Sequence, residues 1–199
     1  MNRRVILMTL LKGLSLFGFL ALFALDLGCK GSDSIAPVTA SFTPSGSAST
    51  ANLVRLRGTT SGDRVTIDFT LQGPTSTNDL YSFGFDLVLS DPGVVELIPG
   101  STRFGPALDL TGSQQGQILA SQSGNRVTIG ITKVGGGGGS GVGPTEEVLG
   151  SLDFHVVQRD FTEIFIEGTP PHDATALDSS GAIANNIVFD PLPSAINGS

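Results

Sequence analysis

The residues best suited to acid–base chemistry in this chain of 199 residues are its two histidines and a few carboxylates. Asp153 and His155 stand two residues apart, so on a β-strand they share one face at about 6 to 7 Å and could form a general-base pair. The apolar residues that alternate with them favour a simpler interpretation, the exposed polar face of a strand. His172 follows two prolines in a stiff loop, where we expect a solvated side chain.

Two further pairs of carboxylates lack the arrangement that catalysis or metal binding requires. Glu146 and Glu147 are adjacent and point apart on a strand, whereas a glycosidase holds two carboxylates facing each other. Asp173 and Asp178 could offer oxygens to calcium, but a spacing of five residues matches no coordination motif. The sequence therefore predicts no catalytic residues, no enzyme activity, no cofactor and no metal site, with calcium as the alternative.

The composition excludes several other classes of protein. Lys and Arg total 11 against 18 Asp and Glu, and the formal charge of −7 leaves no basic surface for nucleic acid. A single Cys excludes a disulfide within the chain and a zinc site built on cysteines. The 27 Gly and 11 Pro favour turns over helices, so a helical bundle is not expected.

Residues 1–28 have the pattern of a secretory signal peptide. Arg3 and Arg4 provide a basic start, and a long apolar stretch follows them. The run Leu-Asp-Leu-Gly-Cys at 25–29 resembles the lipobox of bacterial lipoproteins, whose signal is cut before an acylated Cys. This resemblance implies lipid attachment at Cys29. It also implies an exported chain, anchored by its N-terminal lipid in the cell envelope or at the cell surface.

The alternative for the N-terminus is an uncleaved anchor helix over 5–27, weakened by Lys12. Either interpretation places the rest of the chain outside the cytoplasm. Residues 29–50, rich in Ser, Gly, Thr and Pro, are predicted to form a flexible tether. We expect one folded domain over 51–191 and a C-terminal tail over 192–199.

From about Leu53 onward, apolar residues recur with a period of two, which predicts strands with one buried face. The clearest alternation occurs at 65–71, 81–89, 127–131, 152–156 and 164–166. Shorter strands are expected at 53–57, 94–98, 117–121 and 183–189. Turn residues separate these segments, so the sequence predicts an all-β fold, an antiparallel nine-stranded β-sandwich of the jelly-roll type. The Gly-rich segment 135–143 is expected to be a mobile loop.

Residues 79–97 resemble the cohesin family, in which an aromatic-x-Phe-Asp-Leu strand leads into Tyr-Asp-Pro-x-Val-Leu-Glu. Residues 61–67 are similar to the Pro-Gly-Asp-x-Val-x-Val run that precedes that strand in the family. Residues 126–134, the Gly-rich loop and residues 148–156 resemble the family's last core strands. The resemblance covers about 53–191, with Leu89 and Ser90 where the family has a single Tyr.

The resemblance implies a jelly roll related to carbohydrate-binding modules. Its implied function is non-catalytic binding or scaffolding, with a protein partner of the dockerin kind docked on one sheet face. On this chain the matching strand presents Ser82, Gly84, Asp86 and Val88 as the partner-binding face.

Two other functions remain open. One is a carbohydrate-binding domain acting in polysaccharide catabolism, although the chain has no Trp for stacking on sugars and its one Tyr, Tyr81, is predicted to point inward. The other is an enzyme whose site the sequence does not reveal.

Overall fold

The computed structural model describes residues 36–46, 52–73, 79–141, 143–168, 173–184 and 186–199. All the described strands lie within Pro37–Ser199, which forms one compact unit. The strands are β1 (Ala40–Thr43), β2 (Asn52–Ser61), β3 (Arg64–Gln72), β4 (Leu80–Leu89), β5 (Val95–Leu97), β6 (Arg103–Phe104), β7 (Gln115–Ser123), β8 (Arg126–Val134), β9 (Glu147–Val156), β10 (Phe161–Ile166), β11 (Thr175–Asp178), β12 (Ile187–Phe189) and β13 (Ser194–Gly198).

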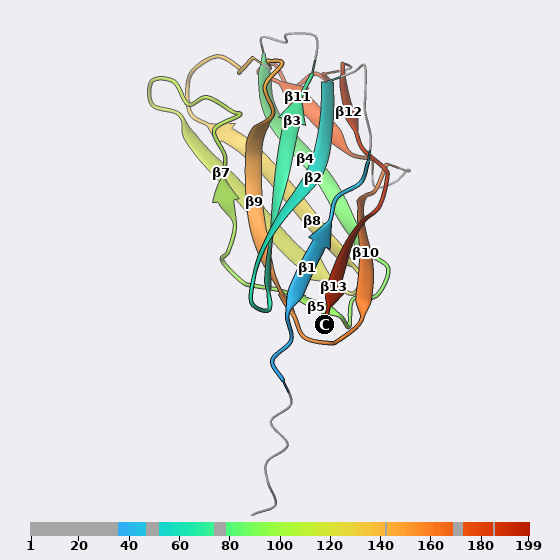
Figure 1. Ribbon diagram of the computed structural model, residues 1–199. Coiled ribbons are helices and arrows are strands. Elements are labelled where there is room, and N and C mark those ends of the chain that lie inside the picture. The colour runs from blue at the N-terminus through green and yellow to red at the C-terminus, as the bar shows by residue number, and fades with distance from the viewer. Residues whose placement is uncertain (1–35, 47–51, 74–78, 142, 169–172, 185) are drawn as a thin grey trace, which may run out of the picture. The chain divides into compact units, whose positions relative to one another are not determined.

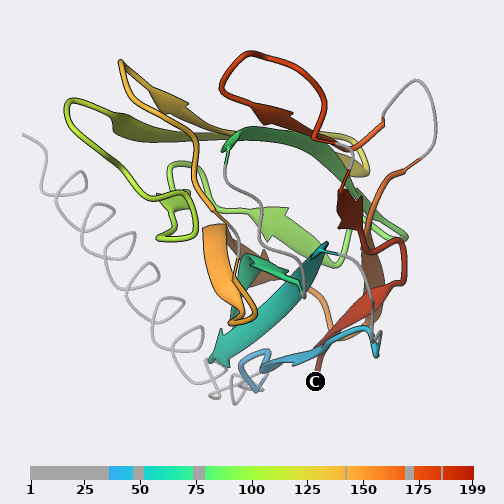
Figure 2. The ribbon, with the colours of Figure 1, turned by 90° about the horizontal axis from the view of Figure 1, so that it is seen from above.

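The strands form two sheets, seen as opposite layers from above (Figure 2). The β4 sheet has the order β1-β13-β10-β4-β8-β7, and β11 also pairs with β4. The β3 sheet has the order β12-β2-β3-β9-β5, and β6 also pairs with β9. Every pairing is antiparallel except that of β12 with β2. The prediction of an all-β antiparallel sandwich is therefore confirmed, with the described residues divided among thirteen strands rather than nine.

The core is built from the alternating apolar residues that the sequence indicates. Phe69 of β3 is completely buried and packs edge-on against Phe85 of β4, with ring centroids 5.1 Å apart. Phe83 and Phe85 both contact Phe189 from β12, with centroids 6.4 and 5.7 Å away. These rings join the two sheets, since apolar burial and edge-to-face aromatic contacts both stabilise such a layer.

The domain extends beyond the predicted boundaries at both ends. Ala40–Thr43, assigned to the tether by its composition, pairs with Ser194–Gly198, assigned to the tail. The latter strand also pairs with β10, so both segments belong to the β4 sheet (Figure 1). Both strands are short, and only Ala40 of β1 and Ser194 and Ile196 of β13 are buried. Their strand structure therefore depends on neighbouring strands rather than on local alternation.

The predicted signal peptide, the predicted lipid-attachment residue Cys29 and His172 lie outside the described residues. Within the described ranges, no helix is long and apolar enough to cross a membrane.

Candidate functional site

The four residues predicted to bind a partner lie on the outer side of β4, a central strand of its sheet. Ser82, Gly84, Asp86 and Val88 alternate with Phe83, Phe85, Leu87 and Leu89, which are buried between the sheets. The predicted division of β4 into an inner and an outer side is therefore correct from Ser82 onward.

Only the first half of this predicted set is accessible. Asp86 and Val88 are buried, with 7% and 8% of their surfaces exposed, although they point away from the core. The Asp86 carboxylate accepts a hydrogen bond from Arg126 at 3.4 Å, and Arg126 also donates to Glu167 at 2.8 Å. The ion pairs lie at the Asp86 end of the outer side of β4, where the strand is buried. Ser82 and Gly84 are the accessible part of β4.

A pair of glycines forms the floor of the accessible region. Gly84 is paired directly with Gly130 of β8, and a Cβ atom added at either residue would meet nothing within 4 Å. Uncharged side chains surround this floor, and we call the whole region the neutral face: Ser82 and Gly84 of β4, Thr128, Gly130 and Thr132 of β8, Gln117, Leu119 and Ser121 of β7, and Thr175 of β11.

Leu119 is the principal apolar side chain of the neutral face. It lies opposite Gly130 and is 74% exposed. Sequence reasoning missed Leu119 and Gly130 as site residues. Alternation in β8 already indicates that Gly130 points outward, but its position between Gly84 and Leu119 depends on strand register, which a single strand does not reveal.

The Gly-rich segment beside the neutral face is held in place by side chains rather than left without contacts. Lys133 is buried and donates to the Gly138 carbonyl at 3.0 Å and to Ser140 Oγ at 2.9 Å. Burial lowers the pKa of Lys133. Gln114 donates to the same Gly138 carbonyl at 3.1 Å. These hydrogen bonds anchor Gly138 and Ser140 within the segment for which the sequence predicts a mobile loop.

Tyr81 also differs from its predicted orientation. The register of β4 with β11 shifts near its start, and Leu80 takes the buried position there with 1% exposure. Tyr81 is half-buried, its hydroxyl donates to the Gly135 carbonyl at 3.0 Å, and its ring centroid lies 6.0 Å from Lys133 Nζ. A strand irregularity thus moves this ring from the core to the Gly-rich loop.

The outer side of the β3 sheet carries charged side chains in ion pairs. Asp153 is 2% exposed, and its carboxylate accepts from Arg103 at 2.6 and 3.0 Å and from Thr66 at 2.7 Å. Arg64 approaches the same carboxylate at 3.2 Å. The Asp153 carboxylate is therefore paired with two arginines. The structure does not support its interpretation as the base partner of the exposed His155.

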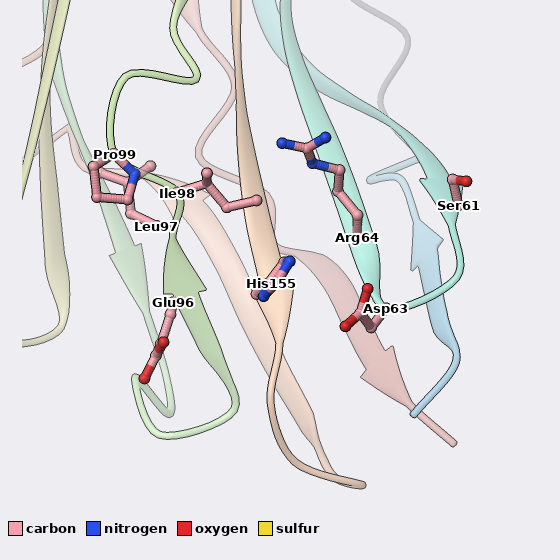
Figure 3. Close-up of a pocket in the computed structure, with 8 residues that line it drawn as sticks. All are labelled: Ser61, Asp63, Arg64, Glu96, Leu97, Ile98, Pro99 and His155. Atoms are coloured by element: carbon pink, nitrogen blue, oxygen red, sulfur yellow. The ribbon is translucent and has the colours of Figure 1, made fainter. Parts of the chain in front are cut away.

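An open pocket of about 580 Å³ lies beside His155, near the turn between β2 and β3 (Figure 3). Arg64 and Glu96 are the residues paired with His155 on the two neighbouring strands. The pocket is also lined by the carboxylates Asp63 and Glu96 and by Arg64, which is paired with Asp153. This arrangement offers no single charged group to orient a ligand, and we assign the pocket no function.

The other carboxylates singled out by sequence are also placed. Glu146 pairs with Arg57 at 2.8 Å and accepts from Thr70 at 2.6 Å, whereas Glu147 is exposed. Asp178 accepts from Ser180 and from the Ala182 amide, both within its own turn. In the described part of the chain, no three His, Cys, Asp or Glu side chains are grouped to hold a metal ion.

Three carboxyl groups of the β3 sheet and its surroundings have shifted pKa values, because of burial and of contacts with arginines. The pKa of Asp153 is lowered, chiefly because Arg103 donates to its carboxylate. Burial alone would raise the pKa of Glu146, but the hydrogen bonds from Arg57 and Thr70 outweigh burial and lower it. Burial raises the pKa of Asp68, although Arg103 opposes this shift.

We expect the free energy of unfolding to fall as the pH decreases from about 5 to about 3. In the folded protein the pKa values of Asp153 and Glu146 are lowered. Their ionised carboxylates therefore stabilise the fold at pH values above the unfolded-state pKa, and this stability is lost as the pH falls through the lower folded-state pKa. Asp68, with its raised pKa, contributes in the opposite sense: its stability is present below the ordinary pKa and is lost as the pH rises. Urea unfolding at several pH values measures the profile.

The variant Asp153→Asn should be less stable than the wild type at pH 7 and should lose less stability on acidification. Glu163→Gln, on the exposed side of β10, is the matched control and should keep the wild-type slope. A wild-type profile without an acid decrease, or an Asp153→Asn profile with the wild-type slope, would contradict the assignment.

Comparison with known proteins finds no matching family model and no matching curated protein. Among solved structures, the chain is similar to a non-cellulosomal cohesin from the archaeon Archaeoglobus fulgidus, with 15% identity and a TM-score of 0.45 over 71% of this chain and 86% of that chain. It is also similar to a type II cohesin domain from the cellulosome of Acetivibrio cellulolyticus. That match has 11% identity and a TM-score of 0.49 over 74% of this chain and 95% of the other.

A third similar structure is a type II cohesin-X-dockerin complex from Acetivibrio cellulolyticus, with 8% identity and a TM-score of 0.47 over 71% of this chain and 96% of that chain. Each of these three similar structures contains a cohesin.

Proposed function

We propose that this chain is a non-catalytic, cohesin-like module that binds a protein partner of the dockerin kind through the neutral face. The observation that carries the proposal is the open pair Gly84 and Gly130, bordered by Leu119, on a protein with a net charge of −7. A flat region without charge and with one exposed apolar side chain can be covered by a partner at little desolvation cost. The sequence resemblance of 79–97 to cohesins indicates the class of partner.

The proposed location is the cell envelope, with the chain anchored through lipid at Cys29. This part of the proposal is supported by the lipobox-like run at 25–29 and the basic, apolar segment before it. Such an anchor would display the module, and through it a docked partner, outside the cytoplasm.

The test is a binding panel in which the full-length chain, in detergent micelles, is titrated with calcium-loaded dockerin modules and applied in parallel to a glycan array. We expect micromolar or tighter binding to at least one dockerin module, and loss of that binding when a chelator removes calcium from the dockerin loops. The array should give no signal, because the chain has no Trp and the hydroxyl of its one Tyr is bonded to the Gly-rich loop.

Binding to glycans but to no dockerin would overturn the proposal in favour of a carbohydrate-binding domain. Binding to neither ligand would also contradict the proposed class of partner.

A further inference from the structure

The strand β7 is an edge of the β4 sheet without the usual protection against pairing with another strand. Among the described strands, β7 pairs only with β8, over nine residue pairs, and it forms the left margin of the ribbon in Figure 1. Soluble proteins block such edges with charged residues, prolines or bulges. The sequence of β7, QGQILASQS, contains no charged residue and no proline, and its register with β8 is regular.

The backbone groups that face the free edge follow from the hairpin between β7 and β8. Ser123 and Arg126 pair across the two-residue turn Gly124-Asn125, and such a pair is hydrogen bonded in both directions. Hydrogen-bonded pairs alternate along an antiparallel ladder, so Leu119 and Ser121 also bond to β8. The amides and carbonyls of the alternate residues, including Ile118 and Ala120, therefore point to the free edge.

Residues 97 and 102 each make a hydrogen bond to β7 on this side. The Ile118 carbonyl accepts from Thr102 Oγ1 at the long distance of 3.5 Å, which agrees with its direction toward the edge. The Gln122 side chain, rather than its backbone, accepts from the Leu97 amide at 3.1 Å. An incoming strand can use the second lone pair of the Ile118 carbonyl and the backbone of Ala120.

We propose that β7 pairs antiparallel with β7 of a second copy of this chain, with Leu119 on the two-fold axis. In this register the backbone amide and carbonyl of Ile118 form hydrogen bonds with those of Ala120 in the other copy. The two Leu119 residues lie opposite each other between these bonded pairs, without backbone hydrogen bonds of their own. Side chains in such a pair are close, so the two exposed leucines cover each other. The remaining pairs on the outer side join Gln117 to Ser121 and Gln115 to Ser123.

Charge favours a second copy at this edge over other parts of the surface. Each chain carries a net charge of −7, so two copies repel each other, but every pair across the β7 junction is uncharged. A two-fold junction is also self-complementary, because Gln115 and Gln117 of each copy face Ser123 and Ser121 of the other. The dimer should consequently become tighter as salt increases, since salt screens the repulsion between the chains.

Disulfide trapping tests both the dimer and its register. The full-length chain is used with its only Cys removed, Cys29→Ala, and Leu119→Cys is compared with Ser121→Cys. In Leu119→Cys the two introduced thiols would lie on the axis, within disulfide reach. In Ser121→Cys they would be about 13 Å apart along the junction, beyond reach.

We expect rapid formation of a disulfide-linked dimer in Leu119→Cys and at least tenfold slower formation in Ser121→Cys. Equal rates in the two variants, or no disulfide in Leu119→Cys, would overturn the proposal.

Sedimentation equilibrium of the cysteine-intact, reduced chain provides the second measurement. Leu119→Lys places two like charges on the axis and should weaken the dimer at least tenfold, while Leu110→Lys, another exposed leucine outside the strands, should leave it unchanged. Both side chains are exposed, so both variants should fold. A monomeric wild type, or equal effects of the two lysines, would overturn the dimer. Because the dimer covers Leu119, which also borders the neutral face, the dockerin proposal is tested separately by the binding panel.

Discussion

Replacing Phe69 by Ala is expected to lower the free energy of unfolding by about 4 kcal/mol, the largest effect of any single truncation considered for this fold. Phe69 has no exposed surface and its ring packs edge-on against Phe85 of the opposite sheet. The substitution removes apolar contacts, leaves a cavity and deletes an aromatic pair between the layers. Urea unfolding of the full-length chain measures the change as a lower midpoint at an unchanged slope.

The matched control for this truncation is Phe161→Ala. Phe161 is 56% exposed, so its removal should change the free energy of unfolding by no more than about 0.5 kcal/mol. Equal losses in the two variants, or a loss below about 1 kcal/mol for Phe69→Ala, would show that the two sheets do not share the core described above.

The long strands could be predicted from sequence because burial on one side imposes a period of two. The alternations at 65–71 and 127–131 correspond to β3 and β8, whose apolar residues are buried with polar residues between them. The phenylalanines of β4 face inward as expected. In these segments the local pattern and the tertiary packing agree, so the sequence alone indicates the fold class.

The short strands could not be predicted in this way. In β13 only Ser194 and Ile196 are buried, and β6 has two residues. Such segments become strands because a neighbouring strand offers a free edge, and this information is not local. The inward orientation predicted for Tyr81 fails for a related reason, since the irregular start of β4 depends on its pairing with β11.

The candidate site was predictable in part. Alternation places Ser82, Gly84, Asp86 and Val88 on one side of β4, but burial of Asp86 depends on Arg126 from the next strand along the sheet. The neutral face likewise joins residues more than thirty positions apart, such as Gly84 and Gly130. Strand register creates this surface, and register depends on the whole sheet.

The second large effect concerns binding: Gly130→Trp is expected to weaken dockerin binding at least 100-fold. An added Cβ at Gly130 meets nothing within 4 Å, and its backbone is outside the left-handed region, so the side chain can be accommodated without strain. Tryptophan also favours strands more than glycine does. The variant should therefore stay folded while its ring covers Gly84 and blocks close approach of a partner.

Calorimetric titration of the dockerin selected by the binding panel into wild type, Gly130→Trp and Thr59→Trp tests the neutral face most directly. Thr59 is exposed on β2 of the opposite sheet, so Thr59→Trp adds the same bulk away from the proposed site. If the partner docks on the neutral face, Thr59→Trp should bind within twofold of the wild type and Gly130→Trp should lose binding. Wild-type affinity in Gly130→Trp, or loss of binding in Thr59→Trp alone, would contradict docking on this face.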